Sequence, residues 1–366
     1  MKNNTYIIVI LLIFPFAVFS NSGTYAQGIG IYAPHLGSGD AITISTAFSG
    51  ITQVSGLSGG RKNPASYFVE RNELLIEGDM WDSVPIQSGV SSPGARFGVS
   101  EIGYLIKAPN SVFTFSRVPR NRIHASGGPY ENTDKKDRLG HNEIEAAYAV
   151  RIKKTTDFGV AVRWVRGEFA TGSLIHDVPG IETIYRPSFF EIAFGLRKKN
   201  EKLSWGIVIE TPAFGRYEKG VDNNVDMARD KSYHSFKGAP ALIVGAGYAG
   251  KGFGLDADFS LRSVENVSSQ NTAFDDKGLI LENGIALNWT ISDKSKLYSG
   301  IRSRMGTVEE SRSLIPGLGI SYLIAEDITL NAGAGMLLPI SGGYSGTTLE
   351  DLYPFSIKIG ILYHGE

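Results

Sequence analysis

The sequence has no cysteine and almost no net charge. The absence of cysteine excludes disulfides, thiolate catalysis, iron–sulfur clusters and cysteine-ligated zinc. The 36 basic and 37 acidic residues give a net charge of −1, which excludes the strongly basic chain typical of a nucleic-acid binder. After residue 27 there is no run approaching the ~18 consecutive apolar residues of a membrane-spanning helix. Abundant instead are glycine (44), phenylalanine (19) and tyrosine (16), a composition that favours strands, turns and aromatic girdles.

The first 26 residues have the pattern of a secretory signal peptide. Lys2 gives a short positive region, and residues 7–19 form an apolar run of 13 residues. Such a run is too short to cross a hydrocarbon core of ~30 Å as a helix, but it has the length of a signal-peptide core. Thr24 and Ala26 supply small residues for a cleavage site before Gln27. We expect residues 1–26 to be removed on export, an uncleaved anchor being the alternative.

Strand-like alternation is clearest near the C-terminus. In residues 355–363 every second position is apolar or aromatic, and Ser356, Lys358 and Gly360 lie between them. Residues 141–153 and 252–262 repeat the pattern. Because side chains alternate across a strand, each segment has one oily face and one face that is polar or small. About ten residues is the length that a tilted strand needs to cross a bilayer.

The connections between these segments are alternately short and long. Short polar turns fall at residues 108–110, 153–157, 198–202, 250–252, 292–295 and 325–327. Mostly longer connections lie between them, at residues 82–96, 120–140, 169–187, 214–238, 265–278, 306–312 and 339–352. Outer-membrane barrels show this asymmetry, with short periplasmic turns and long outward loops. A first strand near residues 67–81, six hairpins and the terminal strand make about 14 strands, with both chain ends on the short-turn side.

The sequence therefore predicts an all-β fold, a transmembrane antiparallel up-and-down β-barrel over residues 67–366, in the outer membrane of a Gram-negative-type bacterium. A secreted β-sandwich or propeller would also alternate, but its polar faces would be rich in lysine. Here those faces hold small residues and charges of both signs. The apolar faces carry aromatic residues near strand ends, as an interfacial belt does: Trp164, Phe190, Trp205, Tyr248, Trp289, Tyr322 and Tyr363.

The opposite faces of these strands would line the lumen with seven acids and seven bases: Glu143, Glu145, Arg151, Arg163, Glu191, Arg197, Glu210, Asp256, Asp258, Arg262, Glu282, Arg302, Arg304 and Lys358. A selective ion channel would show one dominant sign. A balanced set indicates ion pairs that stiffen the wall or hold a plug. Residues 27–66, rich in glycine and placed between signal and first strand, are the candidate plug, because a 14-stranded barrel has room for such a segment.

This segment ends in Gly59-Gly60-Arg61-Lys62-Asn63-Pro64-Ala65, and about fourteen strands follow. In both respects the chain resembles the FadL/TodX family of outer-membrane transporters. In that family an Asn-Pro-Ala motif, here Asn63, Pro64 and Ala65, closes an N-terminal hatch. The resemblance implies passive passage of long-chain fatty acids or similar hydrophobic molecules from the outer loops, through an internal pocket, to a lateral opening. The chain is shorter than expected of fatty-acid members and does not end on an aromatic residue.

An apolar ligand needs an apolar pocket and, for a carboxylate, a cation. Candidate cations are Arg151, Arg163 and Arg197, and candidate apolar residues near the mouth are Ile184, Tyr185, Phe189 and Phe214. We expect a monomer among outer-membrane lipids, with no catalytic residue, cofactor, metal or nucleic acid. One alternative is a barrel of this kind that anchors or shuttles secreted proteins. A second is a barrel lipase or deacylase, since Gly56-Leu57-Ser58-Gly59-Gly60 matches a G-x-S-x-G pattern.

Overall fold

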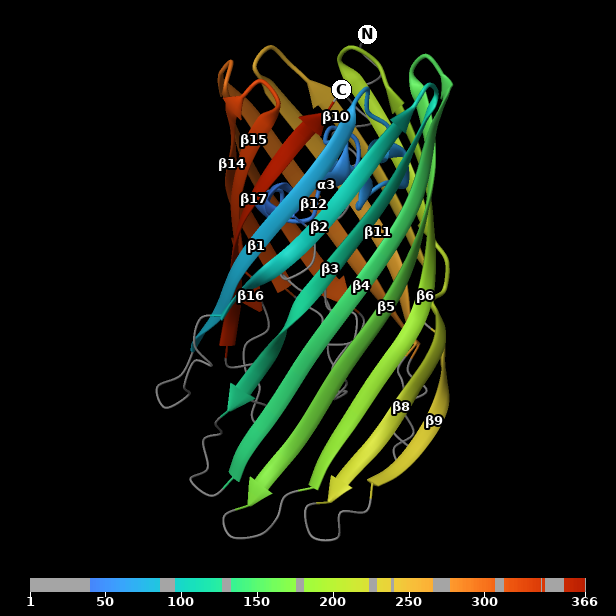
Figure 1. The fold of residues 1–366 in the computed structure, drawn as a ribbon, viewed down its shortest axis with the longest axis vertical. Coiled ribbons are helices and arrows are strands. Elements are labelled where there is room, and N and C mark those ends of the chain that lie inside the picture. The colour runs from blue at the N-terminus through green and yellow to red at the C-terminus, as the bar shows by residue number, and fades with distance from the viewer. Residues whose placement is uncertain are drawn as a thin grey trace.

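The computed structural model describes residues 40–85, 96–126, 133–175, 181–223, 229–237, 240–265, 277–306, 313–336, 338–339 and 352–365. These residues form one antiparallel sheet that closes on itself, because the first strand pairs with the last (Figure 1). The strands are β1 (Asn72–Pro85), β2 (Arg96–Ala108), β3 (Ser111–Ser126), β4 (Thr133–Lys153), β5 (Thr156–Ile175), β6 (Ile181–Lys199), β7 (Leu203–Glu210), β8 (Phe214–Asn223), β9 (Arg229–Lys237), β10 (Ala241–Ala249), β11 (Phe253–Glu265), β12 (Lys277–Ser292), β13 (Ser295–Gly306), β14 (Ser313–Ala325), β15 (Ile328–Met336), β16 (Leu338–Pro339) and β17 (Leu352–Gly365).

The 17 strands make 14 crossings of the barrel wall, as the sequence predicts. Strand β6 pairs with β7 at one end and with β8 at the other, so β7 and β8 are two parts of one crossing. Likewise β10 pairs with β7 while β9 pairs with β8, and β14 pairs with both β15 and β16. Each crossing pairs with its sequence neighbours, which is the up-and-down topology.

All six predicted short turns join consecutive strands, but three predicted loops contain strands. Residues 120–140, 169–187 and 214–238 include the far ends of β3 to β6 and all of β8 and β9. These stretches carry no apolar alternation in the sequence, because the sheet from β3 to β9 extends past the end of the other strands (Figure 1). The first strand also begins later than predicted, at Asn72, since Tyr67 belongs to a short 3₁₀ helix.

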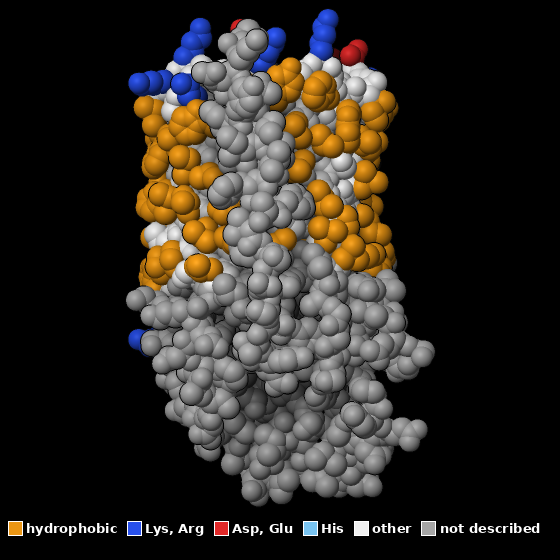
Figure 2. Space-filling model, turned by 180° about the vertical axis from the view of Figure 1, so that it is seen from behind, with side chains coloured by type: hydrophobic (Ala, Val, Ile, Leu, Met, Phe, Trp, Pro, Cys, Tyr) orange, Lys and Arg blue, Asp and Glu red, His pale blue; other side chains and the backbone are white. Residues whose placement is uncertain are grey.

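The outer face of the barrel is apolar. Along β7 the side chains of Leu203, Trp205, Ile207 and Ile209 are exposed, whereas the residues between them are buried. Figure 2 shows hydrophobic side chains in a band around the wall, with Lys and Arg at one rim. Of the predicted aromatic belt, Trp164, Phe190, Trp205, Trp289, Tyr322 and Tyr363 are 37–46% exposed. A single-layer barrel with an oily exterior is a membrane-spanning barrel of the outer-membrane type, not a soluble sandwich.

Within the barrel lie residues 40–71, the described part of the chain before β1. It contains the helices α2 (Ala41–Ser45) and α3 (Leu57–Gly60) and the 3₁₀ helix η2 (Pro64–Tyr67), drawn in blue behind β1 and β2 in Figure 1. Helix α2 contacts β13, β14, β15 and β17, and η2 contacts β4, β5 and β6. We call residues 40–71 the lumenal segment. The expected signal peptide and residues 27–39 lie outside the described residues. No helix in the described part of the chain is long and apolar enough to cross a membrane.

The depth of an outward-facing residue in the bilayer determines how far an arginine at that position would lower the free energy of unfolding. Ile359 is the central outward residue of β17, and Tyr363 is the outward residue nearest the strand's end. We expect Ile359→Arg to lower the free energy of unfolding by about 2–4 kcal/mol, as for arginine near a bilayer midplane, and Tyr363→Arg by no more than about 1 kcal/mol. Urea unfolding in phospholipid vesicles measures both. Equal losses at the two sites would contradict a hydrocarbon-facing exterior.

Candidate functional site

The wall that faces the lumenal segment is lined with glycine. A Cβ atom on Gly300 would overlap the backbone of Thr46, and one on Gly317 or Gly333 would overlap the carbonyl oxygens of Ile44 or Ala41. Gly159 and Gly195 likewise meet the segment's backbone at Pro64 and Ala65, and four more inward glycines meet its side chains: Gly245, Gly247, Gly284 and Gly319. The backbone of the segment therefore lies closer to the wall than any larger residue would allow.

Carboxylates of the wall accept hydrogen bonds from backbone N–H groups of the lumenal segment. The donor and acceptor pairs are Ala41 to Glu77 (2.5 Å), Leu57 to Glu73 (2.8 Å), Gly50 to Asp258 (2.8 Å), and Thr52 and Gln53 to Asp256 (3.0 and 2.9 Å). All four carboxylates are buried. Each contact satisfies a backbone N–H of the segment and a buried carboxyl oxygen of the wall together, so these contacts hold the segment's backbone in place.

Arginines of the wall bind the carbonyl groups of the same segment. Arg302 donates to the carbonyl oxygen of Phe48, and Arg163 to that of Arg61 at 2.7 Å. Arg197 donates to the Ser55 hydroxyl at 2.7 Å and lies 3.5 Å from the carbonyl oxygens of Val54 and Phe68. Acidic side chains of the wall therefore satisfy backbone amides of the segment, and arginines of the wall satisfy its backbone carbonyls. The helices of the segment are too short to satisfy these groups by internal hydrogen bonds.

The lumenal charges also pair with one another. Arg163 contacts Glu145 at 2.5 Å, Glu191 at 3.0 Å and Glu210 at 3.4 Å. From the segment itself, Arg61 contacts Glu143 at 2.7 Å and Glu101 at 3.7 Å. Burial alone would lower the pKa of Arg61, but these carboxylates raise it above its ordinary value. Breaking such a buried pair would leave a charge without compensation, which costs several kcal/mol. The predicted balance of signs thus corresponds to ion pairs that grip the segment.

The turn after α2 is strained and is clamped from both sides. Ala47 and Phe48 have φ values of 51° and 61°, a left-handed conformation that costs about 1–2 kcal/mol for a residue other than glycine. Arg302 and Asp258 of the wall bind Phe48 and Gly50, and Lys62 of the segment donates to Thr46 at 2.6 Å and to the Ser49 carbonyl. Burial lowers the pKa of Lys62 to about 8, partly offset by Asp40 and Asp258.

The Asn-Pro-Ala motif joins the segment to the wall. Asn63 is fully buried and its side-chain oxygen accepts from the Ala65 N–H at 3.1 Å, which caps η2. Its amide nitrogen lies 3.2 Å from the carbonyl oxygen of Ile51 in the segment and 3.4 Å from that of Leu196 in the wall. One side chain therefore ties two parts of the segment to β6.

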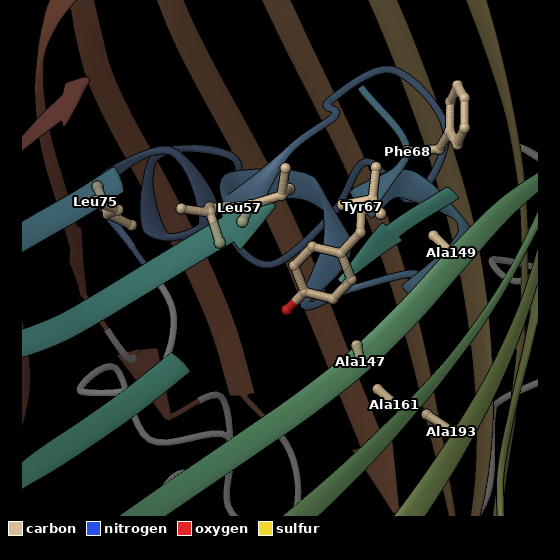
Figure 3. Close-up of a cluster of buried hydrophobic side chains, with 10 residues drawn as sticks. Leu57, Tyr67, Phe68, Leu75, Ala147, Ala149, Ala161 and Ala193 are labelled. Atoms are coloured by element: carbon tan, nitrogen blue, oxygen red, sulfur yellow. The ribbon is translucent and has the colours of Figure 1, made fainter. Parts of the chain in front are cut away.

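Next to the motif is an apolar cluster. Figure 3 shows the ring of Tyr67 directed toward Ala147 on β4, and Leu57 of the segment and Ala161 on β5 belong to the same cluster. The hydroxyl of Tyr67 donates to Glu145, so the ring packs on alanine while its polar end joins the charge network. Burial, with Glu145 beside it, raises the pKa of Tyr67 well above its ordinary value, so the hydroxyl stays protonated as the donor.

Of the predicted ligand residues, Arg151 and Arg197 meet at one carboxylate, that of Asp157. Arg163 and Arg197 are engaged by the contacts above, and Arg151 pairs with Asp157 at 2.8 Å and with Glu70 at 3.2 Å. Phe189 is buried, whereas Phe214 is 53% exposed on the outer face and stacks on Phe190. Segment 214–238, which contains it, is a strand pair and not a loop. The side chains of Ile184 and Tyr185 lie outside the described residues.

Sequence reasoning missed the acids of the first two crossings. Glu73, Glu77 and Glu101 are buried and face the lumen. Glu73 and Glu77 alternate with exposed or half-exposed residues such as Leu74 and Ile76, so alternation could have found them. Within the described residues no group of three His, Cys, Asp or Glu side chains could hold a metal ion.

No family model and no curated protein matches the chain. Among solved structures, its fold is similar to that of CymD, a monoaromatic hydrocarbon channel, with a TM-score of 0.65 and 11% identity over 91% of this chain and 99% of that one. It is also similar to the toluene transporter TodX of P. putida (0.63, 10%, 90% and 99%) and to a Pseudomonas aeruginosa FadL homologue (0.66, 9%, 93% and 100%). The resemblance inferred from the sequence is thus confirmed for the fold. At such low sequence identities, structural similarity is evidence of the fold alone.

Filling one glycine of the wall tests how the segment is seated. We expect Gly300→Val to push Thr46 away, which costs about 1–3 kcal/mol of overpacking and loosens α2. Faster amide hydrogen exchange at residues 41–49 and a higher conductance in planar bilayers would report it. The matched control is Ser299→Val, whose side chain points outward beside Leu318. Wild-type exchange and conductance in the Gly300 variant would contradict the close contact.

Two substitutions at Asn63 separate its two roles. Asn63→Ser keeps a hydroxyl that can cap η2 but is too short to reach Ile51 and Leu196, whereas Asn63→Ala loses both functions. We expect a loss of about 1 kcal/mol from Ser and about 2–3 kcal/mol from Ala in the opening free energy of residues 57–68. Hydrogen exchange of these amides measures it. A larger loss of opening free energy for Asn63→Ser than for Asn63→Ala, or no loss for either variant, would refute this interpretation of the motif.

Proposed function

We propose that this protein is a passive channel through which hydrophobic small molecules, long-chain fatty acids or similar compounds, cross the outer membrane. The oily exterior and the polar, segment-filled bore support this proposal. So does the likeness of the fold to structures named as a hydrocarbon channel and a toluene transporter. In this proposal residues 1–26 are the signal peptide, residues 27–66 are a hatch that closes the bore, and residues 67–366 are the barrel, which acts as a monomer.

The observation that carries the proposal is an interruption in the wall between β2 and β3. The two strands pair from Ala108↔Ser111 to Ile102↔Arg117. Among the described pairings, residues 96–101 of β2 then pair with β1 alone, and residues 118–126 of β3 pair with β4 alone. A second, shorter interruption lies between β7 and β8, where residues 211–213 belong to no strand and the pairing with the next crossing stops at Ala241↔Glu210 and Phe214↔Lys237. Ser100 is an extra residue opposite the Glu77–Gly78 bond, a bulge at the point where β2 leaves β3.

This interruption begins at the depth of the membrane. Val99 and Ile102, on either side of the bulge, are 48% and 46% exposed on the outer face. Backbone groups without partners in hydrocarbon cost several kcal/mol each, so a closed wall would have kept this ladder intact. In this proposal the break gives an apolar molecule on the long-loop side of the lumen a lateral route into the lipid. The molecule then does not pass through the charged part of the bore nearer the short turns.

The interruption and the lumenal segment share one carboxylate. Glu77 accepts from the Ser100 hydroxyl at 2.9 Å and from the Ala41 N–H at 2.5 Å, and Lys358 lies 3.5 Å from it. A movement of the bulge would therefore alter a contact that holds the start of α2. This link supports a channel in which the wall route and the hatch act together.

One observation favours the alternative of a role in protein interaction. Strand β9 pairs with β8 and, among the described residues, with no other strand, and the far part of β3 has an equally open edge. Edges of this kind can accept a strand from another chain. A pull-down from the native host distinguishes the channel from the anchor for secreted proteins. A secreted partner bound in stoichiometric amounts, together with no uptake of hydrophobic compounds, would favour the anchor.

A cross-link across the interruption tests the lateral route. The chain has no cysteine, so Val99→Cys with Arg120→Cys places single thiols on the two separating strands. We expect a short bifunctional thiosulfonate to stop uptake of radiolabelled oleate and toluene by cells of a host without its own barrel of this fold. Reduction should restore the uptake, because the link holds the two edges together.

The control pair is Tyr104→Cys with Phe115→Cys, which face each other inside the intact ladder. Its cross-link should leave uptake unchanged, which separates closure of the route from damage to the barrel. Uptake that survives the cross-link at residues 99 and 120 would rule out this path.

A further inference from the structure

Four turns at the periplasmic rim are rich in lysine. They join β4 to β5, β6 to β7, β10 to β11 and β12 to β13, and with the strand ends beside them they carry eight lysines: Lys153, Lys154, Lys198, Lys199, Lys202, Lys251, Lys294 and Lys296. The acids of the same turns and strand ends are Asp157, Glu201 and Asp293, and Asp157 is paired with Arg151 and Arg197. Seven of the eight lysines are exposed, and Lys198 is half-buried. We call this set the basic arc.

The basic arc is continuous around one side of the barrel. Strand β5 pairs with β6, β7 with β10, and β11 with β12, so each of the four turns is next to another along the rim. The next turn, between β14 and β15, carries Glu326 and Asp327 and no lysine. In a chain with a net charge of −1, this is a local concentration of positive charge and not a general property of the surface.

The lysines stand at the edge of the hydrophobic band. Each turn is flanked by an apolar residue that is exposed on the outer face: Ile152 (56%), Leu203 (37%), Phe253 (43%) and Ile291 (62%). Figure 2 shows Lys and Arg side chains directly beyond the band at this rim. Since a strand rises about 3.3 Å per residue, the lysines of the turns lie at the level of the headgroup layer, whereas Lys153, Lys199 and Lys296 continue the inward-facing rows of β4, β6 and β13.

No ion pair joins any of the eight lysines to another described residue, so their charge is not neutralised within the described chain. Lys199 lies within electrostatic reach of Arg197, Asp157, Lys296 and Arg151, so charges of both signs act on it at the inner edge of the arc. Unpaired lysines at headgroup depth match one chemistry in particular, the phosphate of an anionic lipid.

We propose that the basic arc binds anionic phospholipid headgroups of the periplasmic leaflet and so surrounds this side of the barrel with anionic lipid. An acidic periplasmic protein would also be attracted to positive charge. The lysines, however, follow the edge of the hydrophobic band, where a lipid phosphate is fixed, and their flanking residues are apolar anchors for acyl chains. The proposal does not depend on what the barrel transports.

Two tryptophans of the outer face are natural reporters of the adjacent lipid. Trp205 is the cross-strand partner of Lys198, and Trp289 is the partner of Phe253 beside Lys251. In a background with Trp81→Phe and Trp164→Phe, the full mature chain is placed in vesicles of brominated phosphatidylglycerol or brominated phosphatidylcholine, and quenching gives the relative affinity of the two lipids. We expect a preference of about fivefold for phosphatidylglycerol, lost in ~1 M salt.

The decisive variant replaces Lys154, Lys198, Lys251 and Lys294 by Gln, which should reduce the preference to about one. Its matched control makes the same change at Lys135, Lys136, Lys219 and Lys231, in β4, β8 and β9 near the opposite end, and should keep the preference. Equal quenching by the two lipids in the parent protein, or a preference that survives the first variant, would overturn the proposal. The first of these outcomes would leave an acidic protein as the partner to seek.

Discussion

A charge enclosed by a barrel wall must find a partner, and the lumen of this protein is organised around that requirement. The lumenal segment has helices of only four and five residues, so its backbone amides and carbonyls cannot satisfy one another. Carboxylates such as Asp256 and Glu73 bind the amides, and Arg197 and Arg302 bind the carbonyls. The dependence is mutual, because the same contacts compensate wall charges that would otherwise be buried alone. Segment and barrel form one polar core, although they are separate in sequence.

The shape of the lumen follows the same division of roles. Where the wall binds the segment through charge, acids and arginines project inward, and between them glycines such as Gly300 and Gly317 remove the side chain altogether. Alternating long charged residues with glycine lets helix α2 touch the wall while arginines reach around it. The cost is local strain at Ala47 and Phe48, which the clamp of Arg302, Asp258 and Lys62 holds in place. The most tightly bound turn of the segment is therefore also its most strained.

Alternation with a period of two predicts much of this fold, because lipid on one side and lumen on the other force each crossing to separate apolar from polar residues. The inward charges of β4, β11 and β17 follow from it directly. It fails for residues 120–140 and 214–238, where the sheet continues beyond the hydrophobic band and no oily face is required. It also cannot assign partners: Gly50 and Asp258 are 208 positions apart, and nothing in the sequence pattern sets which acid meets which amide. Phe214 shows a further limit of the sequence pattern. Because the pattern assigns residue 214 to a loop, it does not predict on which face of the sheet its side chain lies.

The polarity of the bore decides where an apolar molecule can travel. Passing along the axis would require it to separate pairs such as Arg163 with Glu145 and Arg61 with Glu143, and it could offer no hydrogen bonds in exchange. Moving sideways where β2 leaves β3 needs no such loss, because the ladder is already interrupted at Ser100 and the flanking Val99 and Ile102 are apolar. The charge network that fixes the lumenal segment thus makes the axial path unfavourable for a hydrophobic compound. In the proposed channel, this network and Glu77, which contacts both features, favour the lateral route over the axial one.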